Sequence, residues 1–113
     1  MPETEEHVLR RFPVLAEMVR RLVAAFHPER IYLFGSHARG ESTPNSDFDL
    51  LMVVSDSSVP RYRRDQEAFR ALLGVGASKD IVVLTREEFD RKRKVVCSLA
   101  ATVEREGLLL YGA

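Results

Sequence analysis

The chain has 113 residues, of which 17 are lysine or arginine and 17 are aspartate or glutamate, so its formal net charge is zero. This length is typical of one domain with a modest core, and we expect residues 1–113 to form a single domain without a second lobe. A balanced charge gives no overall field that would draw the protein to nucleic acid or to a membrane surface. The lone Cys97 cannot form an internal disulfide, and the sequence has neither a signal peptide nor an apolar stretch of bilayer-spanning length. These features predict a cytoplasmic protein with no membrane partner and no direct nucleic-acid partner.

The first quarter of the chain has the apolar spacing of a helix, with steps of three and four residues. The apolar positions are Val8, Phe12, Leu15, Val19, Leu22 and Phe26. Pro13 interrupts this pattern, so it either opens a helix or kinks a longer one, and Pro28 ends it. Residues 30–34 then predict a strand buried on both faces, because residues 31–34 form a continuous apolar run.

The next segment predicts a short helical turn after Gly35, a polar loop over residues 41–46 and a second strand over residues 47–54. A parallel crossover usually needs a dozen or more residues and often a helix. The connection between these two strands has little length to spare, so we expect antiparallel or mixed pairing.

The second half predicts a helix from Pro60 to about Leu73, a strand over residues 79–84 and a final helix that reaches Glu106. The predicted inward residues of the two helices are Phe69, Leu72 and Leu73, and then Phe89, Val96, Leu99 and Val103. Thr85 and Glu88 have the spacing of a capping box at the start of the final helix. Residues 108–111 form a short last strand or a contact patch. The order αβαβαβα indicates an α/β (α+β) fold with a small mixed sheet flanked by helices.

A glycine-serine turn followed by two spaced aspartates is the most informative feature of the chain. Gly35 and Ser36 end the first strand, and Asp47 and Asp49 begin the second. Alternate side chains of a strand share a face, so the two carboxylates can point the same way. Hard oxygen ligands suit Mg²⁺ that also holds substrate phosphates. Gly35 lets the backbone approach a phosphate closely, and Ser36 adds a hydroxyl.

These motifs resemble the active-site signature of the nucleotidyltransferases related to DNA polymerase beta. They are most similar to the smallest members, the minimal nucleotidyltransferases called MNT or MntA, which are commonly partnered with a HEPN-domain protein. The resemblance rests on residues 31–36, on Ala38-Arg39-Gly40, on residues 46–50 and on Asp80 in a later strand. It implies the nucleotidyltransferase fold, two Mg²⁺ ions held by Asp47, Asp49 and Asp80, and a nucleoside triphosphate at Gly35 and Ser36.

Several of these positions have a second interpretation. Asp80 is either the third metal ligand or a polar residue at the start of a strand, next to Lys79. Arg39 matches the motif arginine and either contacts the triphosphate or braces the loop through Glu41 or Asp47. We expect His37 to face solvent. The basic clusters at 61–64 and 91–94 are either solvated faces or contacts for a triphosphate, a partner or RNA.

Three functions compete at this level. The resemblance favours an enzyme that transfers a nucleoside monophosphate, AMP from ATP, to a hydroxyl, namely a tyrosine of a HEPN toxin, which makes the chain an antitoxin. The second is a binding module that neutralises a HEPN protein without catalysis. The third is a small-molecule nucleotidyltransferase, for which 113 residues leave no substrate lobe unless an oligomer supplies it.

Overall fold

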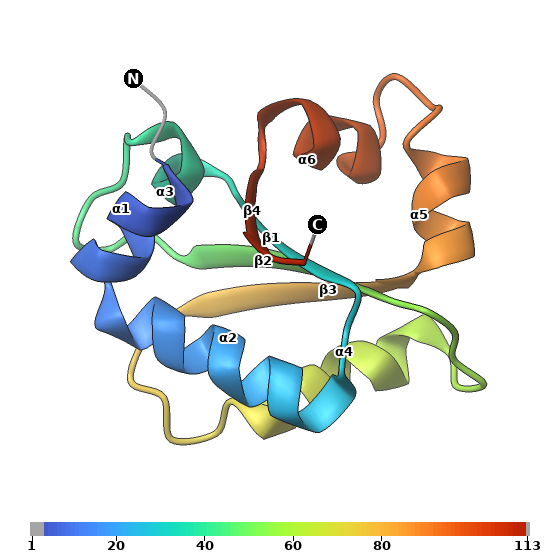
Figure 1. Ribbon diagram of the computed structural model, residues 1–113, viewed down its shortest axis with the longest axis horizontal. Helices are drawn as coiled ribbons and strands as arrows, with labels where there is room; N and C mark the ends of the chain where they lie inside the picture. Colours follow the sequence, from blue (N-terminus) through green and yellow to red (C-terminus); the bar gives the residue numbers. More distant parts are fainter. Residues whose placement is uncertain (1–3, 113) are drawn as a thin grey trace.

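The centre of the molecule is a four-stranded sheet in the order β3-β2-β1-β4 (Figure 1). The computed structural model describes residues 4–112. Its strands are β1 Arg30–Phe34, β2 Phe48–Val54, β3 Lys79–Thr85 and β4 Leu108–Tyr111. β1 is antiparallel to β2 and β4, whereas β2 and β3 are parallel. The mixed sheet that the short connection before β2 predicts is thereby confirmed.

Helices cover both faces of this sheet. They are α1 Glu5–Arg11, α2 Pro13–Phe26, α3 Ser36–Arg39, α4 Arg61–Ala71, α5 Arg86–Lys92 and α6 Leu99–Glu106. In Figure 1, α2 and α4 lie below the sheet, and α5 and α6 lie above it. Successive residues of β2 point to opposite faces, so Leu50 joins the core with α1, α2 and α4, while Leu51 joins the core with α5 and α6. No helix within residues 4–112 is long and apolar enough to cross a bilayer.

The N-terminal helical segment consists of two helices rather than one kinked helix. α1 ends at Arg11, and Pro13 is the first residue of α2. Proline suits this position because its missing N–H group would have no partner within the helix. The helices bury Val8, Leu15, Met18 and Leu22. Of the two roles predicted for Pro13, the structure shows the helix start.

The predicted final helix from Thr85 to Glu106 is wrong in its middle. The capping box at its start is present, because Thr85 accepts a hydrogen bond from the backbone of Glu88 and the Glu88 side chain accepts one from Thr85. The helix α5 then ends at Lys92, and α6 begins after Ser98, whose hydroxyl caps it. Ser98 also donates a hydrogen bond to the Lys92 carbonyl, which stabilises the break. Residues 93–98 therefore leave the helical path, and Val96 and Leu99 are 84% and 39% exposed instead of inward.

The predicted inner face of α4 is correct at Leu72 and wrong at Phe69 and Leu73. Phe69 and Leu73 are exposed, and the buried positions are Arg64, Ala68 and Leu72. These lie four residues apart and so form one stripe along the helix. A stripe that contains an arginine is invisible to a pattern based on apolar residues alone, which explains the error.

Candidate functional site

The loop after β1 brings Gly35 into contact with Asp49. Gly35 has a φ of 77°, and a Cβ atom built on it would overlap the Asp49 carboxylate. Glycine is therefore required here both by its conformation and by the closeness of Asp49. The helix α3 begins directly afterwards at Ser36. The glycine-serine turn and the second motif aspartate, 14 positions apart in sequence, thus lie side by side.

The strand register places Asp49 and Asp80 next to each other. Asp49 is opposite Phe34 of β1 on one side and opposite Asp80 of β3 on the other. Paired residues of neighbouring strands project to the same face of a sheet. This is the face that α5 and α6 cover farther along at Leu51 and Val53. Asp49 is only half-buried and Asp80 is exposed, so this end of the face is open.

The acids of this region influence one another electrostatically. Burial raises the pKa of the Asp49 carboxyl above its ordinary value, and the nearby carboxylates of Asp80 and Asp47 raise it further. His37 and Arg39 lower the same pKa. Two neighbouring carboxylates that are both ionised repel each other, and a divalent cation converts that repulsion into attraction. The charge distribution is therefore suited to a cation.

The donor set fits a magnesium ion chemically, because it consists of carboxylate oxygens. The residues that would hold it are Asp47, Asp49 and Asp80. Within the described part of the chain, no three acidic, histidine or cysteine side chains are gathered around one point as ready metal ligands. The structure thus brings the acids to one open end of the sheet, and their convergence on a metal stays a prediction.

Arg39 has a partner on its own loop. Its Nε donates a hydrogen bond to Glu41 Oε1 over 2.6 Å, and both side chains are largely exposed. The bracing interaction predicted with Glu41 is present, and exposed pairs of this kind add little stability. The contact of Arg39 with a triphosphate and the role of Ser36 stay predictions.

The arginine cluster at 61–64 divides into exposed and buried members. Arg64 is 6% exposed and donates to both carboxylate oxygens of Glu88, over 2.7 and 3.1 Å, and to the carbonyl of Val83 over 3.1 Å. This pairing holds the pKa of Glu88 well below its usual range, at about 2. Arg64 therefore joins α4, β3 and α5, and it is not directed at a substrate.

His37 is buried, contrary to the expectation that it faces solvent. It is 3% exposed, and its ring lies 4.1 Å from the ring of Phe48, nearly parallel to it. The sequence offered no periodic signal for this burial, because α3 has only four residues. The neighbouring segment that carries Asp47 passes directly over the histidine, since the carbonyl of Ser46 lies 3.3 Å from His37 Nε2.

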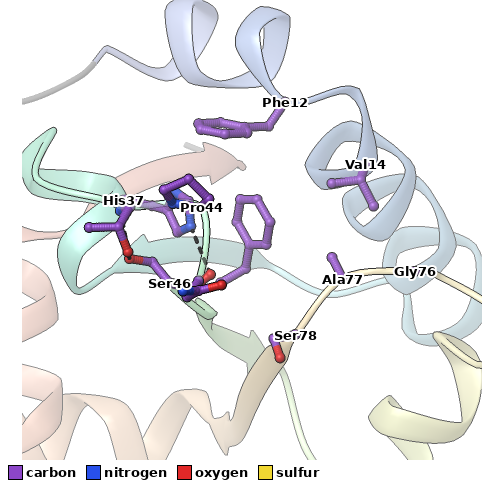
Figure 2. A pocket seen from close by; sticks show the side chains of 11 residues that line it. Phe12, Val14, His37, Pro44, Ser46, Gly76, Ala77 and Ser78 are labelled. Atoms are coloured by element: carbon purple, nitrogen blue, oxygen red, sulfur yellow. Dashed lines mark hydrogen bonds between the residues drawn. The ribbon is translucent and has the colours of Figure 1, made fainter.

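A pocket of about 380 Å³ lies beside His37 and Phe48. Figure 2 shows His37 and Pro44 on one side of it and Val14 and Ala77 on the other, with Phe12 above. Phe48 and Asp49 are adjacent residues of β2 and point to opposite faces. The pocket is therefore separated from Asp49 and its strand partner Asp80 by the sheet, and it is not the place where these two acids would act.

The comparison with protein families agrees with this geometry. The nucleotidyltransferase domain family matches residues 14–108, which is most of the chain. The protein belongs to this family. A search of curated proteins gave no match.

Solved structures with the same fold include a putative nucleotidyltransferase from Sulfolobus solfataricus. It is 23% identical with a TM-score of 0.66, over 99% of this chain and 90% of that one. A toxin-antitoxin structure with AMP-PNP is 26% identical with a TM-score of 0.54, over 86% and 73% of the two chains. A mutant MntA-HpeT toxin-antitoxin is 23% identical with a TM-score of 0.51, over 86% and 72%. The first and third likenesses support the fold alone.

Proposed function

We propose that residues 1–113 form a single-domain, cytoplasmic, Mg²⁺-dependent nucleotidyltransferase that moves AMP from ATP to a hydroxyl group, namely a tyrosine of a HEPN toxin. In this function the chain is the antitoxin. The observation that carries the proposal is the register of Asp49 with Asp80, beside a glycine that leaves no room for a side chain. Like charges directly opposite each other on a sheet are destabilising. A divalent metal bound between the two carboxylates would offset this repulsion and would explain why both acids are present.

The reaction we propose is an in-line displacement at the α-phosphorus. The acceptor oxygen forms a bond to phosphorus, the bond to the bridging oxygen of pyrophosphate breaks, and pyrophosphate leaves with the electron pair. Two Mg²⁺ ions held by Asp47, Asp49 and Asp80 would neutralise the charge of the triphosphate and lower the pKa of the acceptor hydroxyl. The backbone at Gly35 and the Ser36 hydroxyl hold the terminal phosphates. Asp80, which is exposed at the start of β3, accepts the proton of the acceptor hydroxyl.

A protein acceptor is supported by the toxin-antitoxin structure to which the chain is 26% identical in sequence, and the AMP-PNP in that structure supports a nucleoside triphosphate as donor. The described residues cover the sheet with two helical layers and include no separate substrate lobe. A partner that brings its own hydroxyl to the open end of the sheet needs no such lobe.

The test is transfer of radiolabel from α-labelled ATP to a co-purified HEPN partner in the presence of Mg²⁺. We expect labelled partner with the wild-type protein and none with Asp47→Asn. The matched control is Asp56→Asn, an equal change of charge in the loop that follows β2, at its opposite end. It should leave the labelling unchanged.

Replacement of tyrosines in the partner, one at a time, identifies the acceptor. Absence of label on the partner with the wild-type protein would reject the transferase. Neutralisation of the toxin by Asp47→Asn as efficient as by the wild type would show instead that complex formation suffices, which is the binding-module function.

A further inference from the structure

His37 lies in a cluster of aromatic rings directly beneath the aspartate motif. Its ring stacks on Phe48 at 4.1 Å with an interplanar angle of 8°, and it meets the edge of Phe12 at 4.9 Å and 83°. Phe12 and Phe48 also contact each other, at 5.4 Å. Phe12 joins α1 to α2, His37 belongs to α3, and Phe48 opens β2. The cluster therefore ties together three segments of the chain, one of which leads directly into the aspartate motif.

The hydrogen bond of His37 shows which of its two ring nitrogens carries a proton. A carbonyl oxygen accepts hydrogen bonds and cannot donate them, so the contact with Ser46 requires a proton on Nε2. The other nitrogen, Nδ1, is buried and has no hydrogen-bond partner among the described residues. A buried polar atom without a partner destabilises the fold. Phenylalanine would fill the same stack without this cost, so packing alone does not explain a histidine here.

The two contacts of His37 lie on either side of Asp47. Its Nε2 holds the carbonyl of Ser46, the residue before Asp47, and its ring holds Phe48, the residue after it. The turn that precedes Asp47 is closed by hydrogen bonds between Thr43 and Ser46 and so forms a unit of its own. The bond from His37 joins this unit to α3, which directly follows Gly35.

We propose that His37 is a positioning residue that fixes Asp47 relative to the Gly35-Ser36 turn. It acts through the backbone carbonyl of Ser46 and the aromatic ring of Phe48, the residues on either side of Asp47. The inference goes beyond the proposed function and rests on it only for the consequence in catalysis. Outer partners that orient metal ligands typically change metal affinity or activity by 10-fold to 100-fold when they are removed.

The decisive variant is His37→Phe, which keeps the stacked ring and removes the hydrogen-bond donor. We expect a melting temperature at or above that of the wild type, because the unpartnered Nδ1 is gone. We expect faster amide hydrogen exchange at residues 46–49, about 10-fold weaker Mn²⁺ binding measured calorimetrically, and about 10-fold lower kcat with little change in the KM for ATP. His37→Gln restores a donor of similar reach and should recover part of the Mn²⁺ affinity.

The matched control is Phe89→Leu, because Phe89 belongs to the core on the other face of the sheet, with α5 and α6. It should lower the melting temperature and leave the exchange of residues 46–49 and the Mn²⁺ affinity unchanged. Wild-type exchange at residues 46–49 in His37→Phe, or equal loss of Mn²⁺ affinity in Phe89→Leu, would overturn the positioning role. Hydrogen exchange needs neither metal nor substrate, so raised exchange in His37→Phe alongside an inactive wild type would reject the proposed transferase and keep the positioning role.

Discussion

The two ends of the parallel pair β2–β3 differ in how their charged side chains are paired. At the beginning, Asp49 and Asp80 lie opposite each other with like charge. Toward the end, Arg64 pairs with Glu88 and donates to the Val83 carbonyl, while Asp65 accepts a hydrogen bond from the Val83 amide over 2.9 Å. The side chains of α4 thus satisfy the exposed edge of β3 in place of a further strand.

This contrast separates charges that stabilise the fold from charges that do not. The pKa of Glu88 is lowered chiefly by its hydrogen bonds to Arg64, so the folded protein favours the ionised carboxylate there. The pKa of Asp49 is raised chiefly by burial, and then by Asp80 and Asp47, so the folded protein disfavours ionisation there. Groups whose environment opposes their usual charge state are common at functional sites. Together with the register of Asp49 and Asp80, this leads us to propose that the beginning of the pair is the functional end and that the rest is structural.

The largest effect should follow from Asp49→Asn at the functional end. Removal of one electrostatic group from a transfer site costs about 10³-fold in rate, and we expect at least that loss in nucleotidyl transfer. The melting temperature should stay the same or rise, because repulsion with Asp80 and Asp47 disappears. Labelling assays and thermal unfolding of the same preparation measure both effects. A large fall in melting temperature would mean that Asp49 stabilises the fold, which would contradict the proposed difference between the two ends.

Arg64→Met should have the opposite effects, lowering stability while leaving the transfer activity of the folded protein unchanged. The substitution keeps a long buried side chain and leaves the Glu88 carboxylate without its partner, which costs about 3 kcal/mol of unfolding free energy. Urea denaturation measures the loss, and transfer activity per folded molecule should be retained below the melting transition. The double variant with Glu88→Gln should lose less than the sum of the two single variants, because both remove the same interaction. Additive losses would show that the pair contributes nothing jointly.

Acid titration should distinguish the two ends through opposite slopes. Glu88 has a pKa lowered from 4.5 to about 2, so its contribution is present above pH 4.5 and is lost as the pH falls toward 2. For this partly exposed carboxylate we expect about 2 kcal/mol, which allows for solvent screening. Asp49 has a raised pKa, so its contribution is greatest below its unfolded value of 3.8 and is lost as the pH rises. Urea denaturation at a series of pH values measures the loss of stability as the pH falls. Glu88→Gln should make this loss shallower and Asp49→Asn should make it steeper. The same slope in both variants would contradict the opposite pKa shifts of the two carboxyl groups.

Local signals in the sequence predicted the strands and the turn around the proposed functional end. The strands around Gly35 and Asp49 are short apolar runs beside turn residues. Asp80 is the second residue of β3, just as Asp49 is the second residue of β2. These features depend on neighbours within a few residues, which a sequence displays directly. The mixed sheet followed from the length of one connection for the same reason.

The errors concern residues whose environment depends on distant partners. Arg64 is buried because Glu88, 24 positions away, neutralises it. His37 is buried because Phe12, 25 positions earlier, closes over it. No periodicity encodes such pairs, since each requires the sheet to be assembled first. The break between α5 and α6 belongs to the same class, because it orients Ala100 and Val103 toward a core that β2 completes.

The prediction with the smallest expected effect tests the interruption between α5 and α6. A continuous helix from Thr85 to Glu106 would bury Val96, and its replacement by serine would then cost about 2 kcal/mol or more. In the structure Val96 is 84% exposed in the segment between α5 and α6. Val96→Ser should therefore change the unfolding free energy by less than about 0.5 kcal/mol in urea denaturation. Val103→Ser is the matched comparison, because Val103 is fully buried on α6 and its change should cost several times more. Equal losses of unfolding free energy in the two variants would support a single continuous helix instead.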